Sequence, residues 1–386
     1  MNILVTCSYW YYADFSYSFI HAQAKAYAAA GQRVRVLIPL PLGSRRLPEG
    51  AVQTVPGVHR LERDGVEIDY VTALSLSNFG NHRIGNYSLN DHAAIAAFRR
   101  LLPDLTQDFQ PDVVHAHTFG YGSEVGSWLS QRLDCPLVVT THGGDLQAFT
   151  AAGQKDVLRS QCDSASAVVA VSAKLANEVA ACGTKVPVYT VYNGFAADRV
   201  ASLPKQPHHL VQVGNLVPSK HNDYTIQAVA RLRKIYPDIT LTIVGNGSER
   251  QRLELLVEKL GLTDCVFFLG TLPNAEALEE MAKAEVFVMP SYPEGFGIVY
   301  LEAMASGCVT IGTESEGIDG FIHSGENGFL VPRDDIDMIV HVIDRCFQSP
   351  ALEESIAAAG RHDAKRQTWA HNAEQYIQLF NELRGN

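Results

Sequence analysis

The residues best suited to do chemistry in this chain are two glutamates, Glu294 and Glu302, in the segment 291–307. The apolar run 287–293 before them is typical of a buried parallel strand. Two glycines in the following turn allow a close backbone approach, and a helical pattern begins after them. A strand end therefore delivers the Glu294 carboxylate to the edge of a sheet, and the N-terminus of a helix begins beside it.

The free N–H groups at such a helix start favour a bound phosphate. Glu302 lies one to two turns into the helix, so the carboxylates lie up to roughly 12 Å apart at ~1.5 Å rise per residue. This is about the span from the sugar to the ribose of a nucleotide-sugar, whose hydroxyl groups could donate to the two carboxylates. A bare pair of glutamates at this spacing more often marks a surface helix. Glu302, however, lies in an apolar stretch, where an unpaired carboxylate would be costly.

Short apolar runs alternate with helical patterns along the whole chain, which predicts parallel sheets flanked by helices. A polar stretch with two prolines, 197–209, predicts a linker between two such domains, 1–196 and 210–368. The expected strands lie at 3–7, 34–40, 67–74, 112–117, 137–142, 167–173 and 186–194 in the first domain, and at 210–215, 241–247, 266–271, 286–290, 309–313 and 328–332 in the second.

Composition excludes several classes of protein. The 386 residues are 46% hydrophobic and 19% charged, as in a soluble globular protein, and no run reaches the ~18 apolar residues that span a bilayer. The start of the chain lacks the pattern of a signal peptide, and the seven scattered cysteines form no CxxC pair, so we expect reduced thiols and a cytoplasmic protein.

The net charge of −11 argues against a nucleic-acid partner. Residues 1–200 hold 16 Lys and Arg against 17 Asp and Glu, whereas the remainder holds 15 against 25. The nearly neutral first half permits a peripheral contact with an anionic membrane.

Two further strand–turn–helix segments could bind phosphate in the second domain. In 211–232, Lys220 falls near the helix start, where its ammonium group could meet a diphosphate, although a solvated surface lysine is the commoner role. In 241–262 the turn is Gly-Asn-Gly, at the carboxyl end of a strand, where ligands collect in open α/β sheets.

Segment 291–307 resembles the signature of the family 4 retaining glycosyltransferases, the group 1 glycosyltransferases. The resemblance covers nearly the full chain and is most pronounced over 205–335. It implies the GT-B architecture, an α/β fold of two Rossmann-like parallel-sheet domains facing a cleft, with the last helix, 369–386, packed back on the first domain. It also implies transfer of a hexose, with retention of configuration, from a UDP- or GDP-linked sugar to a saccharide or lipid-linked acceptor, as in polysaccharide or glycoconjugate biosynthesis. Neither a metal ion nor a cofactor is implied.

At the matching positions the resemblance assigns Glu294 to the hydroxyl groups of the sugar, Glu302 to the ribose and His142 to the sugar near its reacting carbon. Lys220 would hold the diphosphate, and Glu294, His142 and Lys220 form the implied catalytic set. The other implied donor-binding positions are Gly214, Asn215, Asn246, Gly247, Leu272, Gly295, Phe296, Gly297, Ile298 and Val299. Leu272 lies at the family's nucleobase position, where backbone groups recognise the base.

The sequence departs from the family pattern in two places. Asn215 stands where the family has an arginine, so the chain lacks one of the two charges that hold the diphosphate. The first strand–helix loop, within 8–19, has seven aromatic residues and none of the family's glycines. These rings belong either to the core or to a stacking face for an acceptor sugar or lipid; in the second case Trp10, Tyr12 and Tyr17 would bind the acceptor.

His115 and His117 lie on one face of a strand in the first domain. No third ligand at a suitable spacing supports a zinc site, which leaves a structural or an acceptor-side role, and His117 is the acceptor-side candidate. Asp335 and Asp337 resemble a metal motif of another glycosyltransferase architecture, but they open a helix, and stabilisation by its dipole explains them better.

Two alternatives share the architecture: a nucleotide-sugar 2-epimerase, and a nucleotide-sugar-binding protein that has lost catalysis. The second alternative stays open because Asn215 replaces the family's arginine. A nicotinamide dehydrogenase is disfavoured because no strand is followed by Gly-x-Gly-x-x-Gly.

Overall fold

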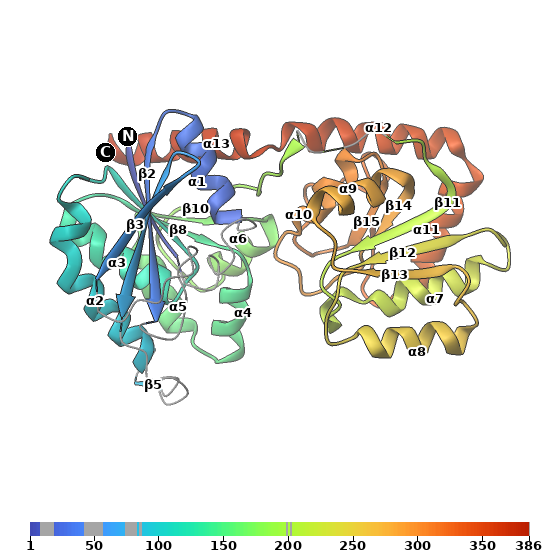
Figure 1. Cartoon of the computed structure of the whole chain (residues 1–386), viewed down its shortest axis with the longest axis horizontal. Helices are drawn as coiled ribbons and strands as arrows, with labels where there is room; N and C mark the ends of the chain where they lie inside the picture. Colours follow the sequence, from blue (N-terminus) through green and yellow to red (C-terminus); the bar gives the residue numbers. More distant parts are fainter. Residues whose placement is uncertain are drawn as a thin grey trace. The chain divides into compact units, whose positions relative to one another are not determined.

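The computed structural model describes residues 1–7, 19–41, 57–73, 83–84, 87–197, 200 and 203–385. The chain divides into two compact units, each an α/β structure (Figure 1). Unit 1 comprises 1–171, 175–192 and 369–386, and unit 2 comprises 172–174 and 193–368. The predicted pair of parallel-sheet α/β domains is confirmed.

The sheet of unit 1 has eight strands in the order β10-β9-β8-β7-β1-β2-β4-β3. Their bounds are β1 (Asn2–Thr6), β2 (Arg33–Pro41), β3 (Val58–Arg63), β4 (Val66–Ala73), β7 (Val113–His117), β8 (Leu137–Thr141), β9 (Ala167–Ala170) and β10 (Val188–Thr190). All neighbours are parallel except β3, which runs antiparallel to β4 at the edge. The sequence patterns missed β3 because this polar, half-exposed edge strand has no continuous apolar run.

The sheet of unit 2 is entirely parallel, in the order β13-β12-β11-β14-β15-β16. The strands are β11 (Gln206–Val213), β12 (Thr240–Val244), β13 (Val266–Gly270), β14 (Ala284–Val288), β15 (Val309–Thr313) and β16 (Phe329–Val331). The predicted linker 197–209 is too long, because β11 already begins at Gln206. Pro207 suggested a linker, and its missing N–H coincides with a shift in the pairing register between β11 and β14.

Helices flank both sheets. Those of unit 1 are α1 (Phe19–Ala29), α2 (Leu89–Thr106), α3 (Tyr121–Leu133), α4 (Gly144–Ala151), α5 (Lys155–Asp163), α6 (Ala173–Ala180), whose first two residues fall in unit 2, and α13 (Trp369–Arg384). Those of unit 2 are α7 (Asn222–Leu232), α8 (Arg250–Leu260), α9 (Asn274–Lys283), α10 (Ile298–Ala305), α11 (Ile336–Gln348) and α12 (Pro350–Arg366), with a short 3₁₀ turn at Pro218–Lys220. A short hairpin pairs β5 (Arg83–Ile84) with β6 (Tyr87–Ser88). None of the helices in the described ranges is long and apolar enough to span a membrane.

The last helix joins the core of unit 1. Ala373, Tyr376 and Phe380 of α13 are buried in one apolar cluster with Ile3 of β1 and Tyr27 of α1. The rings of Tyr27 and Phe380 lie 5.9 Å apart between centroids. Because α13 follows all of unit 2 in sequence, the two ends of the chain are folded into the same unit.

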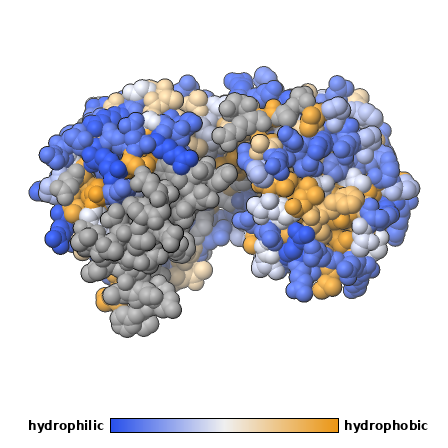
Figure 2. Space-filling model, in the orientation of Figure 1, coloured by the Kyte–Doolittle hydropathy of each residue, from blue (hydrophilic) through white to orange (hydrophobic). Residues whose placement is uncertain are grey.

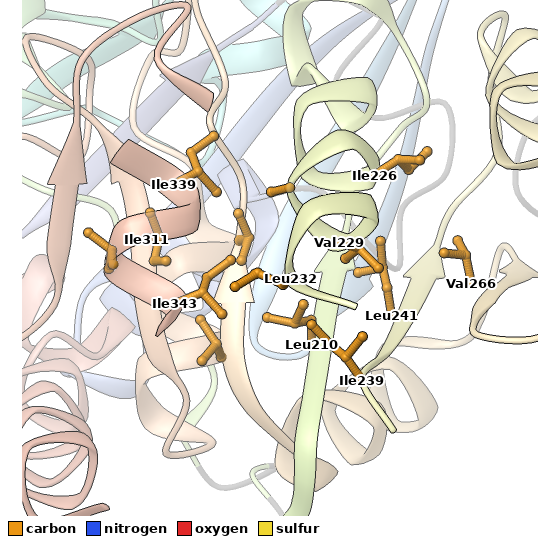
Figure 3. Close-up of a cluster of buried hydrophobic side chains, with 14 of the residues drawn as sticks. Leu210, Ile226, Val229, Leu232, Ile239, Leu241, Val266, Ile311, Ile339 and Ile343 are labelled. Atoms are coloured by element: carbon orange, nitrogen blue, oxygen red, sulfur yellow. The ribbon is translucent and has the colours of Figure 1, made fainter. Parts of the chain in front are cut away.

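The core of unit 2 lies between its sheet and the helices α7 and α11. Ile226, Val229 and Leu232 recur at helical spacing along α7 and meet Leu210 of β11 and Ile343 of α11 (Figure 3). All five side chains are fully buried. At about 1.5–3 kcal/mol for each buried aliphatic side chain, this packing holds the strands firmly, and their carboxyl ends with them.

Hydrophilic residues cover much of the described surface on the face in Figure 2, with smaller apolar areas between them. Exposed apolar side chains include Phe267 and Leu269 on the edge strand β13 and Leu255 on α8.

Candidate functional site

The loops that follow β11 and β12 interlock through their backbones at the carboxyl edge of the second sheet. The Gly214 N–H donates to Val244 at 2.9 Å, and the Leu216 N–H donates to Asn246 at 3.0 Å. A Cβ on Gly245 would lie 1.9 Å from the Gly214 carbonyl oxygen, and one on Gly247 would lie 2.3 Å from the Leu216 oxygen. These glycines therefore allow two loops to pack closer than side chains would permit.

We expect Gly245→Ala to destabilise the protein by roughly 3 kcal/mol or more, because it adds a backbone clash to a strained conformation. Gly245 has a φ of 137°, and its Cβ would meet the backbone, which cannot rotate away. Gly261→Ala is the matched control, since Gly261 has a φ of 69° but open space around its Cβ position. The control variant should lose only about 1 kcal/mol of its free energy of unfolding. Urea unfolding of both variants measures the difference, and equal losses would contradict the close approach.

The predicted catalytic residues Lys220 and Glu294 lie in direct contact. Lys220 ends the 3₁₀ turn before α7, Glu294 follows β14, and the Lys220 Nζ forms an ion pair with the Glu294 Oε2. The Ser291 hydroxyl donates to the same oxygen at 2.9 Å. The Lys220 backbone is also fixed, because its carbonyl accepts a hydrogen bond of 3.1 Å from the buried Gln212 side chain. The lysine and the carboxylate thus neutralise each other.

A second carboxylate, that of Glu316, anchors the Glu294 loop. Its Oε2 accepts a hydrogen bond of 2.8 Å from the Glu294 N–H, and its Oε1 pairs with Arg333. The Glu316 side chain is fully buried, and a Cβ on Gly317 would lie 2.2 Å from the Gly295 oxygen. Glu316 was not predicted as a site residue from the sequence. The signal was present, because Glu316-Gly317 follows β15 much as Glu294-Gly295 follows β14.

The helix α10 begins directly after this loop and carries Glu302 on its second turn. Gly297 has a φ of 81°, and a Cβ there would lie 2.6 Å from the Tyr300 ring. The N–H groups of the first turn of a helix have no partner within it, which makes this end suited to an anion. Of the predicted residues here, Phe296 is 2% exposed and packs near Phe321, so its side chain belongs to the core.

Glu302 is partly buried, and its Oε1 accepts a hydrogen bond of 2.9 Å from the Asn274 side-chain amide. Burial raises the pKa of the Glu302 carboxyl group, and the bond from Asn274 opposes that rise. Asn274 was not predicted as a site residue from the sequence.

The remaining donor-binding candidates lie in loops of the same unit. Asn215 and Asn246 are exposed, after β11 and β12, and Leu272 is partly buried between β13 and α9. The Asn246 Oδ1 accepts from the Gly247 N–H at 2.9 Å. The sheet thus places the candidates from four strand ends along one edge.

In unit 1, His142 follows β8 and lies beside His117 at the end of β7. The His117 Nδ1 and the His142 Nε2 are 3.0 Å apart, and the two rings are stacked. Burial lowers the pKa of His142 to about 3 and that of His117 well below its usual value, so both rings are neutral at pH 7 and one donates to the other. Asp145, which was not predicted from the sequence either, accepts a hydrogen bond of 3.0 Å from the Gly143 N–H and fixes this turn.

His115 has a structural environment. Its Nε2 lies 2.8 Å from the Thr140 hydroxyl, which in turn lies 2.9 Å from the Tyr376 hydroxyl on α13. No cluster of three metal-ligating side chains occurs in the ranges that the structure describes. Trp10, Tyr12 and Tyr17 lie outside the described residues.

Asp335 is the N-cap of α11, as predicted for a residue that opens a helix. Its Oδ1 accepts from the Met338 N–H at 2.8 Å. Asp337 forms an ion pair with Arg231 of α7. Both carboxylates therefore have partners within the fold.

Comparisons with known proteins agree with this architecture. A family model described as "Glycosyltransferase Family 4" matches residues 18–199, and one described as "Glycosyl transferases group 1" matches 196–363. A glycogen synthase of Mycobacterium tuberculosis is 29% identical over 364 residues, which cover 89% of this chain and 84% of that protein. A phosphatidyl-myo-inositol mannosyltransferase of Mycobacterium leprae is 27% identical over 92% of this chain and 90% of its own length.

Solved structures share the fold over the full length. A sucrose-phosphate synthase from Thermosynechococcus elongatus has a TM-score of 0.79 at 20% identity and covers 100% of both chains. The Anabaena protein HepE, in complex with UDP, has a TM-score of 0.75 at 20% identity, covering 99% of this chain and 100% of its own. The two family models together span nearly the whole chain, and this protein belongs to the family 4, or group 1, glycosyltransferases of GT-B architecture.

Proposed function

We propose that this protein transfers a hexose from a UDP- or GDP-linked sugar to a saccharide or lipid-linked acceptor, with retention of configuration and without a metal ion. One observation carries the proposal: Lys220, Glu294, the start of α10 and Glu302 follow one another along one edge of the second sheet. A cation, a helix N-terminus and two carboxylates suit the diphosphate, the sugar and the ribose of one donor.

The ion pair between Lys220 and Glu294 suggests how the donor is accommodated. A diphosphate would take the Lys220 ammonium group, and Glu294 would then accept from hydroxyl groups of the sugar. As the bond to the anomeric carbon breaks, negative charge grows on the diphosphate, where Lys220, the Asn215 amide and the N–H groups of α10 stabilise it. His142 keeps the role that the family motif implies, a contact with the sugar near its reacting carbon. No side chain is assigned as a covalent nucleophile.

Relatives support transfer but leave the donor open. The M. tuberculosis relative is named a glycogen synthase, and a Mycolicibacterium smegmatis relative, 34% identical over 160 residues, is named a GDP-mannose-dependent mannosyltransferase. Structures of HepE contain UDP and UDP-glucose. These similarities favour transfer over the alternative of 2-epimerisation. We further propose a cytoplasmic enzyme that contacts the membrane when its acceptor is lipid-linked, which sedimentation with anionic vesicles tests.

A nucleotide panel followed by product analysis tests the function. A nucleotide that binds the folded chain at ~100 times its Kd should stabilise it by about 2.7 kcal/mol, so UDP, GDP and ADP are compared by thermal shift. The matching nucleotide-sugar is then incubated with saccharide acceptors, with and without EDTA, and NMR gives the anomeric configuration of the product. No stabilisation by any of the three nucleotides would refute the proposal, and an epimer formed without acceptor would establish the epimerase instead.

A further inference from the structure

We propose that Asn274 is the residue through which this site selects a ribonucleotide: its amide holds the Glu302 carboxylate ready for the ribose hydroxyl groups. The inference rests on the proposed function and adds a positioning residue that acts through Glu302.

The contact joins two separate helices. Asn274 is the first residue of α9, directly after the loop that contains Leu272, and Glu302 lies on α10. The Asn274 Nδ2 donates to the Glu302 Oε1 at 2.9 Å, a good distance for a bond to a charged oxygen. Asn274 thus connects the loop at the predicted nucleobase position to the carboxylate at the predicted ribose position.

The surroundings of Glu302 explain why it needs such a partner. Its neighbours Leu301, Ala303 and Met304 are fully buried, and the carboxylate loses much of its hydration. A protonated carboxyl group would present a hydroxyl to the hydroxyl groups of a ribose and would accept them less well. The Asn274 bond favours the ionised form, because an N–H donor stabilises the charged oxygen.

The type of side chain also matters. An ionised carboxylate has about four acceptor positions, of which the single Asn274 bond uses one and leaves the others for two neighbouring ribose hydroxyl groups. A lysine or arginine at position 274 would compete with the ribose hydroxyl groups for the Glu302 carboxylate. An aspartate there would repel that carboxylate. The amide is therefore suited to orient Glu302 without occupying it.

Capping of α9 is the competing explanation for Asn274. Pro273 occupies the cap position of α9 and has no side chain that could cap, and the hydrogen bond of the Asn274 amide goes to Glu302 on another helix. A purely structural Asn274 would affect all nucleotides alike, which gives the experiment its readout.

The experiment compares ribonucleotides with their 2′-deoxy forms. Calorimetry on the full chain measures the Kd of UDP, GDP and ADP, and then of the 2′-deoxy counterpart of the tightest binder. Wild-type protein should prefer the ribonucleotide by on the order of tenfold or more. Asn274→Ala should weaken binding of the ribonucleotide about tenfold. It should weaken binding of the 2′-deoxy form less, because that form offers Glu302 only one hydroxyl group, and so the preference should fall. Asn274→Asp, a nearly isosteric change, should do the same because it places a like charge beside Glu302.

Two further variants complete the design. Glu302→Gln removes the charge and one of the two acceptor oxygens, and it should show the same reduced preference. Glu276→Gln is the matched control, because Glu276 is exposed in the first turn of α9 and its removal should leave the ratio intact. If both Asn274 variants fold and keep the wild-type preference, the inference is wrong while the proposed function stands. If wild type binds none of the three nucleotides, the proposed function fails, and the inference fails with it.

Discussion

Lys220→Ala is expected to lower the rate of sugar transfer on the order of a hundred- to a thousandfold, the usual cost of removing one group that stabilises developing charge. Lys220 is the cation in contact with Glu294, and Asn215 adds no charge where the family has an arginine. The loss should appear in kcat with saturating donor. Lys234→Ala is the control, because Lys234 is an exposed lysine just after the C-terminal end of α7, the helix that Lys220 precedes. A Lys220→Ala enzyme with full turnover would show that the diphosphate is held elsewhere.

The partner substitution, Asn215→Arg, should preserve or raise activity. The Asn215 side chain is exposed at the end of β11, so an arginine can be accommodated without disturbing the core. In the Lys220→Ala background the added guanidinium should recover part of the lost rate, because it restores positive charge beside the diphosphate. Kinetics of the single and double variants decide this, and a loss of activity in Asn215→Arg alone would exclude a diphosphate beside residue 215.

Much of the fold could be predicted because buried strands require apolar residues, which are visible in the sequence. Most central strands of both sheets coincide with a run of apolar residues, since a parallel strand covered on both faces needs them. The edge strand β3, which is half-exposed, has no such run of apolar residues. The error at Gln206 has the opposite cause: Pro207 is typical of a linker, but an irregular pairing with β14 accommodates it inside a strand.

Candidate site residues could be predicted where they lie close together in the sequence. They could not be predicted where the fold brings together residues that are far apart in the sequence. Glu294 and Glu302 lie on one strand–loop–helix segment, so their spacing was visible. Asn274 and Glu316 touch them from other strand ends, 28 residues before Glu302 and 22 after Glu294. Sequence separation of this size hides a contact unless the order of the strands is known. The ion pair between Lys220 and Glu294 was likewise invisible, because it joins loops 74 residues apart.

Because of that ion pair, we expect Glu294→Gln to lower the rate of sugar transfer and to keep or raise the affinity for the nucleoside diphosphate. Transfer should fall by two orders of magnitude or more, because the amide loses the charge that strengthens hydrogen bonds to the sugar hydroxyl groups. Affinity for the nucleoside diphosphate alone should stay equal or rise a few-fold. In the free protein Glu294 competes for the Lys220 ammonium group, and an uncharged side chain competes less.

The Ser291 hydroxyl donates to one oxygen of the Glu294 carboxylate at 2.9 Å, and the Gly295 N–H donates to the other at 3.2 Å. In a glutamine the amide oxygen can accept from the Gly295 N–H and the amide N–H can donate to the Ser291 hydroxyl oxygen, so the loop should keep its shape. Glu326→Gln is the control, since Glu326 is exposed after β15 and carries the same charge. Calorimetry with the diphosphate and steady-state kinetics with the nucleotide-sugar separate the two effects. A variant that binds the diphosphate more weakly yet transfers at the normal rate would mean that Glu294 supports the phosphate site and leaves the sugar to other residues. We expect the first outcome, because a diphosphate bound to Lys220 would replace the Glu294 carboxylate as the partner of the ammonium group.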